Sequence, residues 1–250
     1  MASEAGRIAV VTGGASGIGR KTSELLAERG YTVAIADRNV EGAAEVARGI
    51  TDQGGTAKEF ALDLEQFESI GELRASVVDA FGVPNVVANV AGWDLPGPFL
   101  EDTAEYQRRL IDINLLGPIR VSHEFLTVMV EAGAGGRLIN VSSDAGRVGS
   151  SGEAVYSAAK GGIIALTKAL AREMARYKIN VNCVCPGPTD TPMFRRASEN
   201  LQAALIRGIP LRRLAQPEEI AHSIAYFASD ETAYITGQVL SVSGGLTMVD

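Results

Sequence analysis

A tyrosine and a lysine stand four positions apart in the segment EAVYSAAKGG, as Tyr156 and Lys160. Side chains at this spacing share one face of a helix, so both could point into one site. A free phenol has a pKa of about 10 and is a poor base at neutral pH, but a neighbouring ammonium favours the phenolate and lowers that pKa. Such a pair could move a proton to or from a substrate oxygen. The same spacing also occurs on solvated helices, where it has no chemical role.

The residues around this pair favour the chemical interpretation. Ser143 ends a predicted strand 13 residues before Tyr156, so its hydroxyl could join the same site. Gly161 and Gly162 directly follow the lysine. Each glycine costs about 1 kcal/mol in a helix interior. We therefore expect another helix to approach closely at this point.

A glycine-rich turn lies near the start of the chain, in VVTGGASGIGR. Gly13, Gly17 and Gly19 stand between a predicted strand and a predicted helix. Glycine lets the backbone approach a pyrophosphate closely, and the helix N-terminus offers unpaired amides and a partial positive charge. A tight strand-to-helix turn without a ligand would need some of the same glycines. The strand before the turn and the helix after it favour a dinucleotide site.

An acid at the end of the second predicted strand indicates which dinucleotide binds. Asp37 ends the run TVAIAD, 18 residues after Gly19. A carboxylate there can accept hydrogen bonds from the ribose hydroxyls and would repel a 2′-phosphate, which favours NAD over NADP. Arg38 favours NADP instead, since a guanidinium can hold the 2′-phosphate. Asp37 could also serve as the N-cap of the next helix.

The elements that would position these residues alternate along the chain. Short apolar runs alternate with longer helical patterns, and the predicted strands are RIAVVTG, TVAIAD, TAKEFALD, PNVVANVAG, GRLINVSS, INVNCVCPG and QVLSVSGG. Near-continuous apolar strands separated by helices predict a parallel sheet covered on both faces. We expect one doubly wound α/β domain over residues 1–250, with about seven strands. Residues 188–213 break the rhythm and are predicted to form a substrate lid.

With these residues in place, the chain resembles a classical short-chain dehydrogenase/reductase over nearly its whole length, which implies a Rossmann fold. The turn TGGASGIG has that family's TGxxxGxG form, and NVAG has its NNAG form with Val90 at the second asparagine. The resemblance implies a catalytic tetrad of Asn114, Ser143, Tyr156 and Lys160. It implies cofactor contacts from Gly13, Ser16, Gly17, Ile18, Gly19, Asp37, Asp63, Leu64, Asn89, Tyr156, Lys160, Pro186, Gly187, Thr189 and Thr191.

The resemblance also implies a role for each catalytic residue. Tyr156 would exchange the proton of the substrate oxygen, and Ser143 would orient that oxygen. Lys160 would bind the nicotinamide ribose, and Asn114 would relay protons through water behind the lysine. The apolar C-terminal stretch GQVLSVSGGLTMVD would pack at a two-fold interface of a homotetramer.

Composition limits the partners. A net charge of −7 and a pI near 5.0 disfavour nucleic acid and anionic membranes, which such a chain would repel. No run approaches the ~18 apolar residues of a spanning helix, so we expect a cytoplasmic protein. Cys183 and Cys185 lie two apart in one predicted strand, which favours buried thiols over a disulfide. No further Cys or His pattern suggests a metal site.

The segments around the expected site indicate the substrate. AGWD, RVGSSGEAVY and VCPGPTDT are similar to segments of NAD-dependent family members that oxidise a cyclic β-hydroxyacyl-CoA. The candidate substrate residues are Trp93, Asp94, Arg147, Glu153, Arg195 and Arg196. The phosphates of CoA need cations, and the predicted lid holds several arginines, although these could equally form a solvated face.

Three other functions would use parts of the same sequence pattern. A 3-oxoacyl carrier-protein reductase has a closely related pattern, but it normally uses NADPH, and Asp37 counts against that. A non-catalytic dinucleotide sensor could keep the same pocket, although an intact Ser143, Tyr156 and Lys160 makes this interpretation weaker. A hydrolase has little support, because no GxSxG turn follows a strand.

Overall fold

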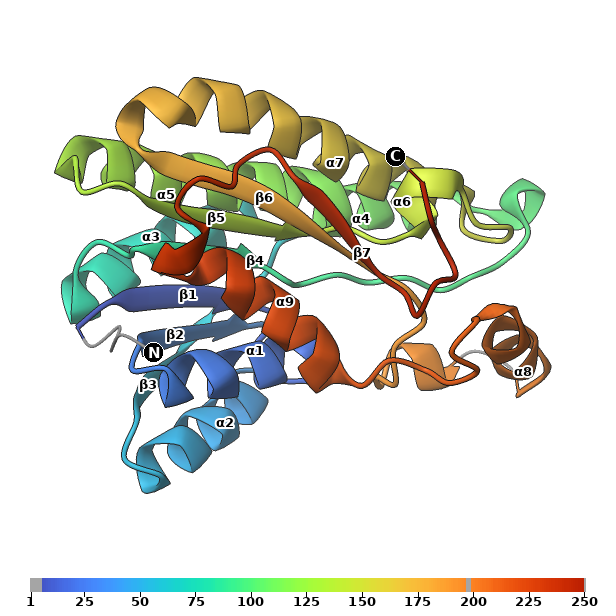
Figure 1. Cartoon of the computed structure of the whole chain (residues 1–250), viewed down its shortest axis with the longest axis horizontal. Coiled ribbons are helices and arrows are strands. Elements are labelled where there is room, and N and C mark those ends of the chain that lie inside the picture. The colour runs from blue at the N-terminus through green and yellow to red at the C-terminus, as the bar shows by residue number, and fades with distance from the viewer. Residues whose placement is uncertain (1–5, 197–198, 250) are drawn as a thin grey trace.

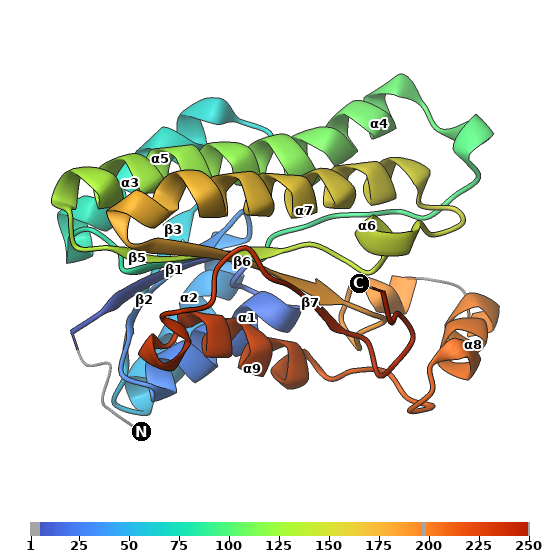
Figure 2. The ribbon, with the colours of Figure 1, turned by 45° about the horizontal axis from the view of Figure 1, so that its top comes forward.

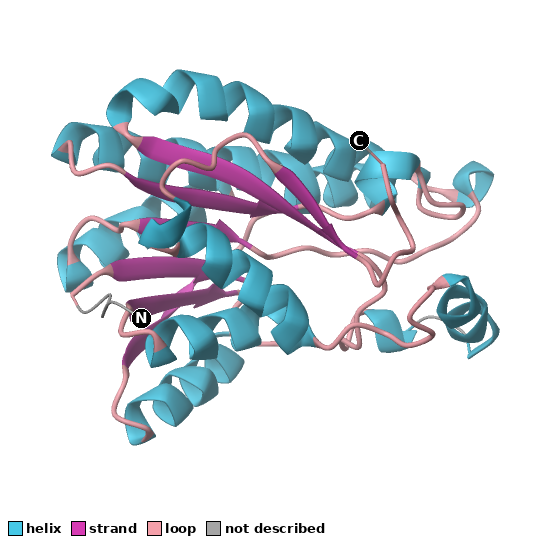
Figure 3. Ribbon diagram, viewed as in Figure 1, coloured by secondary structure: helices cyan, strands magenta, loops and turns pink. Residues whose placement is uncertain are grey.

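In the computed structural model, which describes residues 6–196 and 199–249, the strands form one parallel sheet with the order β3-β2-β1-β4-β5-β6-β7. The strands in this part of the chain are β1 (Ile8–Thr12), β2 (Thr32–Asp37), β3 (Thr56–Ala61), β4 (Val86–Asn89), β5 (Gly136–Val141), β6 (Ile179–Pro186) and β7 (Val239–Val242). Figure 3 shows them as a twisted layer between helices. The predicted doubly wound α/β fold is therefore confirmed.

Helices cover both faces of this sheet. The α-helices of the described residues are α1 (Gly17–Glu28), α2 (Val40–Asp52), α3 (Phe67–Phe81), α4 (Ala104–Ile111), α5 (Gly117–Ala132), α6 (Ala145–Val148), α7 (Ala154–Met174), α8 (Glu199–Gly208) and α9 (Pro217–Ala228). Figure 2 shows α3, α5 and α7 on one face and α1, α2 and α9 on the other. Two apolar cores fill the layers, one on each face. The central strands are apolar along their whole length because both of their faces are buried.

The strand order reverses between β1 and β4. From β1 the chain winds outward through β2 and β3, and from β4 it winds the opposite way to β7. At such a switch point, the loops after the two neighbouring strands separate and leave a crevice at the carboxyl ends of the strands. The glycine-rich turn follows β1, so the fold places it at this crevice.

The predicted lid lies at the same end of the molecule. Residues 197–198 of this segment lie outside the described residues. The described remainder of 188–213 contains η4 (Phe194–Arg196) and α8 but no strand, as expected. Figures 1 and 2 show α8 standing apart from the two helical layers, beyond the carboxyl ends of β6 and β7. That this segment covers a substrate stays a prediction.

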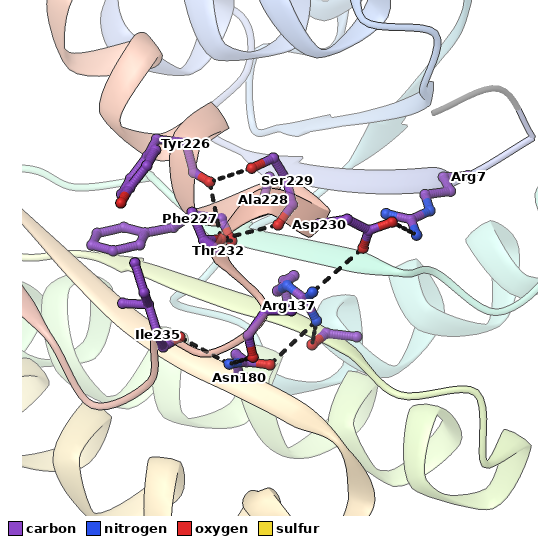
Figure 4. A network of polar contacts seen from close by, with 12 residues as sticks. Arg7, Arg137, Asn180, Tyr226, Phe227, Ala228, Ser229, Asp230, Thr232 and Ile235 are labelled. Carbon is purple, nitrogen blue, oxygen red and sulfur yellow. Dashed lines mark hydrogen bonds and ion pairs between the residues drawn. The ribbon is translucent and has the colours of Figure 1, made fainter. Parts of the chain in front are cut away.

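A polar network ties the opposite end of the sheet together (Figure 4). Asp230, in η5 (Asp230–Thr232), pairs with Arg7 at 2.5 Å and with Arg137 at 3.4 Å. Arg137 in β5 also donates to the side chain of Asn180 in β6 at 3.3 Å. The network fastens the chain after α9 to the amino ends of the strands, so it supports the sheet without approaching the crevice.

The two cysteines are buried in β6 and free, as predicted. Their sulfur atoms lie 3.9 Å apart. Cys183 and Cys185 pack with Ile163 of α7 in a small apolar cluster, so they belong to the core beneath the helix that carries Tyr156.

Candidate active site

The glycine-rich turn is shaped for close backbone approach. Gly13 has a φ of +70°, and a Cβ added there would lie 2.8 Å from the Cα of Ala91. A Cβ on Gly19 would lie 2.1 Å from the carbonyl oxygen of Gly13. Ser16 is the N-cap residue of α1 but makes no side-chain cap, which leaves the amides of the first turn to an anion. The turn fits the pyrophosphate of a dinucleotide.

Asp37 is held against this turn. Its Oδ2 accepts a hydrogen bond from the amide of Ala15 at 3.0 Å, and its Oδ1 accepts from the amide of Asn39 at 2.9 Å. The N-cap of α2 is Asn39, whose side chain accepts from the amide of Gly42. The alternative that Asp37 caps this helix is therefore wrong. Its carboxylate is instead fixed at the end of β2, beside the glycine turn.

The residues that follow β3 lie beside the crevice. Asp63 accepts from the amide of Glu65 at 3.0 Å, and its own amide donates to Ser69 at 2.8 Å. Leu64 is buried against Gly117, where an added Cβ would come within 2.9 Å of the leucine Cβ. The loop is thus rigid, and its predicted contact with the cofactor stays a prediction.

The end of β4 is fixed by side chains of the neighbouring strands β1 and β5 and of helix α5. Asn89 is 3% exposed, and its amide donates to Asn140 at 2.9 Å and to Ser122 at 3.0 Å. Its side chain therefore braces the sheet, and the predicted cofactor contact of Asn89 is not visible in its hydrogen bonds. The hydroxyl of Thr12 accepts from the amides of Val90 and Ala91 at 3.0 and 3.1 Å. Thr12 thereby sets the path of the loop that leads to Trp93.

The segment after β6 passes close to the glycine turn. The amide of Gly187 donates to Val242 at 3.0 Å, and the hydroxyl of Thr189 donates to the carbonyl of Gly187 at 2.9 Å. The Cγ2 of Thr191 lies 3.3 Å from the position of a Cβ on Gly17. The structure thus brings two distant predicted cofactor segments together. Pro186 ends β6 and starts this path.

Lys160 is buried beneath the crevice. It is 2% exposed, and its Nζ donates to the carbonyl oxygen of Val141 at 3.0 Å. An ammonium has three N–H groups, so two remain for a ligand or water. Burial lowers the pKa of Lys160 to about 8. Its Nζ lies 5.6 Å from the ring centre of Tyr156, so the two side chains share one site as predicted.

Tyr156 and Ser143 also meet. The hydroxyl of Ser143 lies close enough to the Tyr156 phenol to favour the phenolate and to lower the pKa of the tyrosine. The pKa of Tyr156 is nevertheless raised, first by burial and then by the charges of Glu153 and Asp94. The expectation that Lys160 brings this pKa toward neutrality is wrong for these surroundings, because burial and the charges of two carboxyl groups outweigh the lowering effect of Ser143.

Asn114 lies in a π-helical turn, η2 (Asp112–Leu116), between α4 and α5. Its Nδ2 donates to the carbonyl of Trp93 at 2.6 Å and to that of Leu110 at 3.0 Å, and its Oδ1 accepts from the amide of Trp93 at 3.1 Å. Asn114 therefore clamps the backbone of Trp93 from both sides. Nothing in the sequence pattern indicated the π-helical turn, which is common at functional sites. The proton relay through Asn114 stays a prediction.

The glycines after Lys160 allow close packing, as expected. A Cβ on Gly161 would lie 3.3 Å from the carbonyl oxygen of Gly146 in α6. A Cβ on Gly146 would lie 2.6 Å from the carbonyl carbon of Lys160, and one on Gly162 would lie 2.9 Å from the side chain of Leu115. The backbones of α6 and α7 are therefore in direct contact, which fixes the helix that carries the tyrosine.

The candidate substrate residues fall into two groups. Asp94 and Glu153 face Tyr156, since both affect its pKa. The ring of Trp93 lies 4.5 Å from the guanidinium carbon of Arg109. Arg147 instead donates to Ser241 and to the carbonyl of Val249, so it binds the C-terminal segment.

The two lid arginines among the candidate substrate residues, Arg195 and Arg196, differ in their contacts. Arg195 forms two hydrogen bonds with Asp190, at 2.8 and 3.1 Å. Arg196 is exposed. The contacts of these two arginines do not include Ser143, Tyr156 or Lys160, and their contact with substrate stays a prediction.

Tyr106 is a neighbour of the site that the sequence did not indicate. Its hydroxyl lies 3.0 Å from Oδ1 of Asp94 and 3.0 Å from the carbonyl oxygen of Leu95. Its ring lies 5.6 Å from that of Trp93. Tyr106 belongs to α4, and only the fold of the loop between β4 and α4 shows that it reaches Asp94.

The known proteins that are similar to this chain include reductases and a dehydrogenase. The sequence profile of the family described as enoyl-(acyl carrier protein) reductase matches residues 13–247. A cis-4-hydroxycyclohexanecarboxylate dehydrogenase of Sinomonas cyclohexanicum is 41% identical over 244 residues, which are 97% of each chain. The 3-oxoacyl-[acyl-carrier-protein] reductases of Vibrio harveyi and Escherichia coli are 38% and 37% identical, over 98% of each chain.

Proposed function

The chain belongs to the short-chain dehydrogenase/reductase family, and we propose that it oxidises a secondary alcohol with NAD, the alcohol being a β-hydroxyacyl-CoA with a cyclic or other acyl group. The observation that carries the proposal is the meeting of Ser143, Tyr156 and Lys160 beside a glycine turn of the right shape. This arrangement places a proton-exchanging phenol next to a dinucleotide site.

Each residue of the proposed site has a separate role in the reaction. When bound, the nicotinamide supplies the carbon that accepts or donates a hydride. Tyr156 takes the proton from the substrate hydroxyl in oxidation and returns it to the carbonyl oxygen in reduction. Ser143 donates a hydrogen bond to the same substrate oxygen and fixes its position. Lys160 is anchored on Val141, so its remaining N–H groups are held in place for the cofactor ribose and for the phenolate.

The surroundings of Asp37 support NAD. Its carboxylate is fixed at the end of β2 next to the turn, where it would meet the ribose hydroxyls and repel a phosphate. Arg38 could offset this repulsion, but its guanidinium lies 3.4 Å from Glu65 and is 64% exposed. A pairing acid makes Arg38 a weaker phosphate ligand.

The proposed thioester rests on likeness and on the lid. AGWD and RVGSSGEAVY are similar to segments of 2-hydroxycyclohexanecarboxyl-CoA dehydrogenase, and one relative is named for a hydroxycyclohexanecarboxylate. Of the lid arginines, Arg195 and Arg213 are held by Asp190 and Glu219. Arg196 and Arg207 are exposed and better placed to meet the phosphates of CoA.

The relatives named as 3-oxoacyl-[acyl-carrier-protein] reductases favour a second candidate, reduction of a 3-oxoacyl thioester on a carrier protein. The two candidates share the proton chemistry and differ in cofactor and carrier. A dinucleotide sensor without turnover is a third interpretation, which the intact catalytic group makes weaker.

We also propose a homotetramer. Several apolar side chains of the C-terminal segment are exposed in the single chain, among them Leu246, Met248 and Val249. Burying such a surface against a second copy is favourable, and closed symmetry lets one patch serve both partners. Light scattering should give four times the chain mass at micromolar concentration, and a monomer would refute this assembly.

None of the helices in the described part of the chain has both the length and the apolar composition needed to cross a bilayer.

The proposed function is tested by turnover. A panel of 3-hydroxyacyl-CoA thioesters, including cyclic ones, is assayed with NAD and with NADP, beside 3-oxoacyl thioesters of CoA and of carrier protein with NADH and NADPH. The proposal predicts the highest kcat/KM for a hydroxyacyl-CoA with NAD. A clear preference for NADPH and a carrier-bound 3-oxoacyl substrate would establish the second candidate instead. No turnover with any pair would support the sensor.

A further inference from the structure

Two carboxyl groups meet beside Tyr156. Asp94 lies in the loop after β4, and Glu153 occupies the N-cap position of α7, three residues before the tyrosine. The two loops are joined by a hydrogen bond from the amide of Gly97 to the carbonyl of Gly152 at 2.9 Å. The Glu153 carboxyl lies within hydrogen-bonding reach of the Asp94 carboxyl. Asp94 itself is only 4% exposed.

The hydrogen bonds of Asp94 are incomplete without a proton. Tyr106 donates to its Oδ1, but no donor among the described residues reaches its buried Oδ2. The group that does reach the Asp94 carboxyl is that of Glu153, and two carboxylates cannot bond to each other. A proton held by one of them turns a repulsion into a hydrogen bond. One proton between the two carboxyl groups would give the buried Oδ2 of Asp94 the partner that it lacks.

We propose that Asp94 and Glu153 form a positioning pair that holds one shared proton beside Tyr156 and, when that proton leaves, opposes ionisation of the phenol. This inference rests on the proposed function, because it concerns the proton that Tyr156 exchanges with substrate. The pair then sets the pH range in which the enzyme oxidises alcohols. With the shared proton in place the pair carries one negative charge, and without it two.

The direction of each titration agrees with this arrangement. Burial, and then the hydrogen bond and charge of Glu153, raise the pKa of Asp94 to about 7. The charges of both acids raise the pKa of Tyr156. The shared proton therefore leaves to solvent near neutrality. Once it has left, the second negative charge of the pair makes the phenol of Tyr156 harder to ionise.

Other charged groups surround the pair, and none of them replaces it. Arg109 stacks on Trp93, the residue before Asp94. Lys160 feels the charge of Asp94, which raises its pKa slightly against the larger effect of burial. The further ionisable groups that act on the pair or its tyrosines are Tyr106 in α4, Asp102 in the loop before α4, and Cys185 in β6. Arg109 and Lys160 are the cations in this group, and both stay the same in the variants below.

The test compares pH profiles of oxidation in Asp94→Asn and Glu153→Gln with that of the parent. Asp94→Asn removes the buried acid of the pair and leaves the Glu153 carboxylate, to which the new amide can donate. In Glu153→Gln the remaining Asp94 is still buried and can keep a proton, so this variant carries at most one negative charge. Below about pH 6 Asp94→Asn carries the same charge as the parent, so its kcat/KM should match. Above about pH 8 the parent carries two charges, and each variant should oxidise the alcohol about tenfold faster, the effect of one unit in the pKa that governs the rate.

Two results would overturn the proposal of a shared proton. A variant slowed by one constant factor at every pH would show that the acids only support structure or contact substrate, which overturns the proposal. Equal rates above pH 8 would do the same. Glu101→Gln is the matched control, because it removes an exposed charge from the same region without touching the pair. It should keep the parent profile.

A second measurement needs neither cofactor nor substrate. Infrared spectroscopy of the parent should show the C=O stretch of a protonated carboxyl group below about pH 6 that disappears above about pH 8. The band should be missing in Asp94→Asn at both pH values and present in Glu101→Gln. If the parent lacks the band, the pair does not share a proton. If no alcohol is oxidised at all, the proposed function fails while the infrared result still decides the pair.

Discussion

The hydroxyl of Thr12 can be removed without changing the shape of the side chain. Thr12 ends β1 and is 2% exposed, and its Oγ1 accepts from the amides of Val90 and Ala91 at 3.0 and 3.1 Å. Thr12→Val keeps the branched shape and replaces the hydroxyl with a methyl group. Both amides would then lose this acceptor at a partly buried position.

The cost follows from those two amides. A buried donor left without a partner costs about 1–3 kcal/mol, and partial burial places each amide toward the lower end. We expect Thr12→Val to lower the free energy of unfolding by about 2–4 kcal/mol. For a chain of this length 1 kcal/mol corresponds to about 2–4 °C in Tm, so Tm should fall by about 5–15 °C.

Urea unfolding at one fixed protein concentration measures this change, with Thr12→Ser as the control. The serine keeps the acceptor and loses a methyl group, so it should cost about 1 kcal/mol. The reasoning predicts the valine variant to be less stable than the serine variant. If valine is within about 0.5 kcal/mol of the parent and serine is not, the methyl packing matters and the two hydrogen bonds do not.

Three further results are expected. Asp37→Ala should weaken NAD binding and raise the ratio of kcat/KM with NADP to that with NAD, since the carboxylate bonds the ribose and repels the phosphate; an unchanged ratio would remove Asp37 from the site. Lys160 has a folded pKa of about 8 against 10.5 for the free side chain, so the unfolded chain binds more protons between these values and stability should rise with pH there. Over that pH range the free energy of unfolding of the parent should rise by up to about 3 kcal/mol relative to that of Lys160→Met. A difference between the two proteins that does not change with pH would contradict the buried ammonium. Arg196→Ala should raise KM for a CoA thioester and leave a small alcohol unaffected, and the same KM for both enzymes would make this arginine part of a solvated face.

The sequence predicted the fold well because local pattern and global packing agree here. Strands such as TVAIAD are apolar along their length, as a sheet buried on both faces requires, and β2 spans that run. The turn residues were predictable for the same reason, because the strand, the glycines and the helix are adjacent in sequence. Gly161 and Gly162 also indicated a close approach, although only the structure identifies Gly146 and Leu115 as their neighbours.

The surroundings of Ser143, Tyr156 and Lys160 could not be predicted in the same way. The pKa of Tyr156 depends on burial and on Asp94, which is distant in sequence and reaches the tyrosine only through the path of the loop after β4. The same path brings Tyr106 to Asp94, and it is set by Asn114 and Thr12, whose hydrogen bonds depend on tertiary structure. A spacing of four residues identifies a pair on one helix and says nothing of the charges that face it.

The most direct test of the proposed chemistry is Tyr156→Phe, measured by NAD titration beside initial rates of alcohol oxidation. The phenylalanine keeps the ring and its packing and removes the hydroxyl that exchanges the proton. The account predicts NAD affinity close to that of the parent and a loss of kcat of about 100-fold or more, the usual contribution of a positioned acid or base. Turnover that survives the substitution, or a loss of NAD binding in step with turnover, would contradict the assignment of Tyr156 as the group that moves the proton.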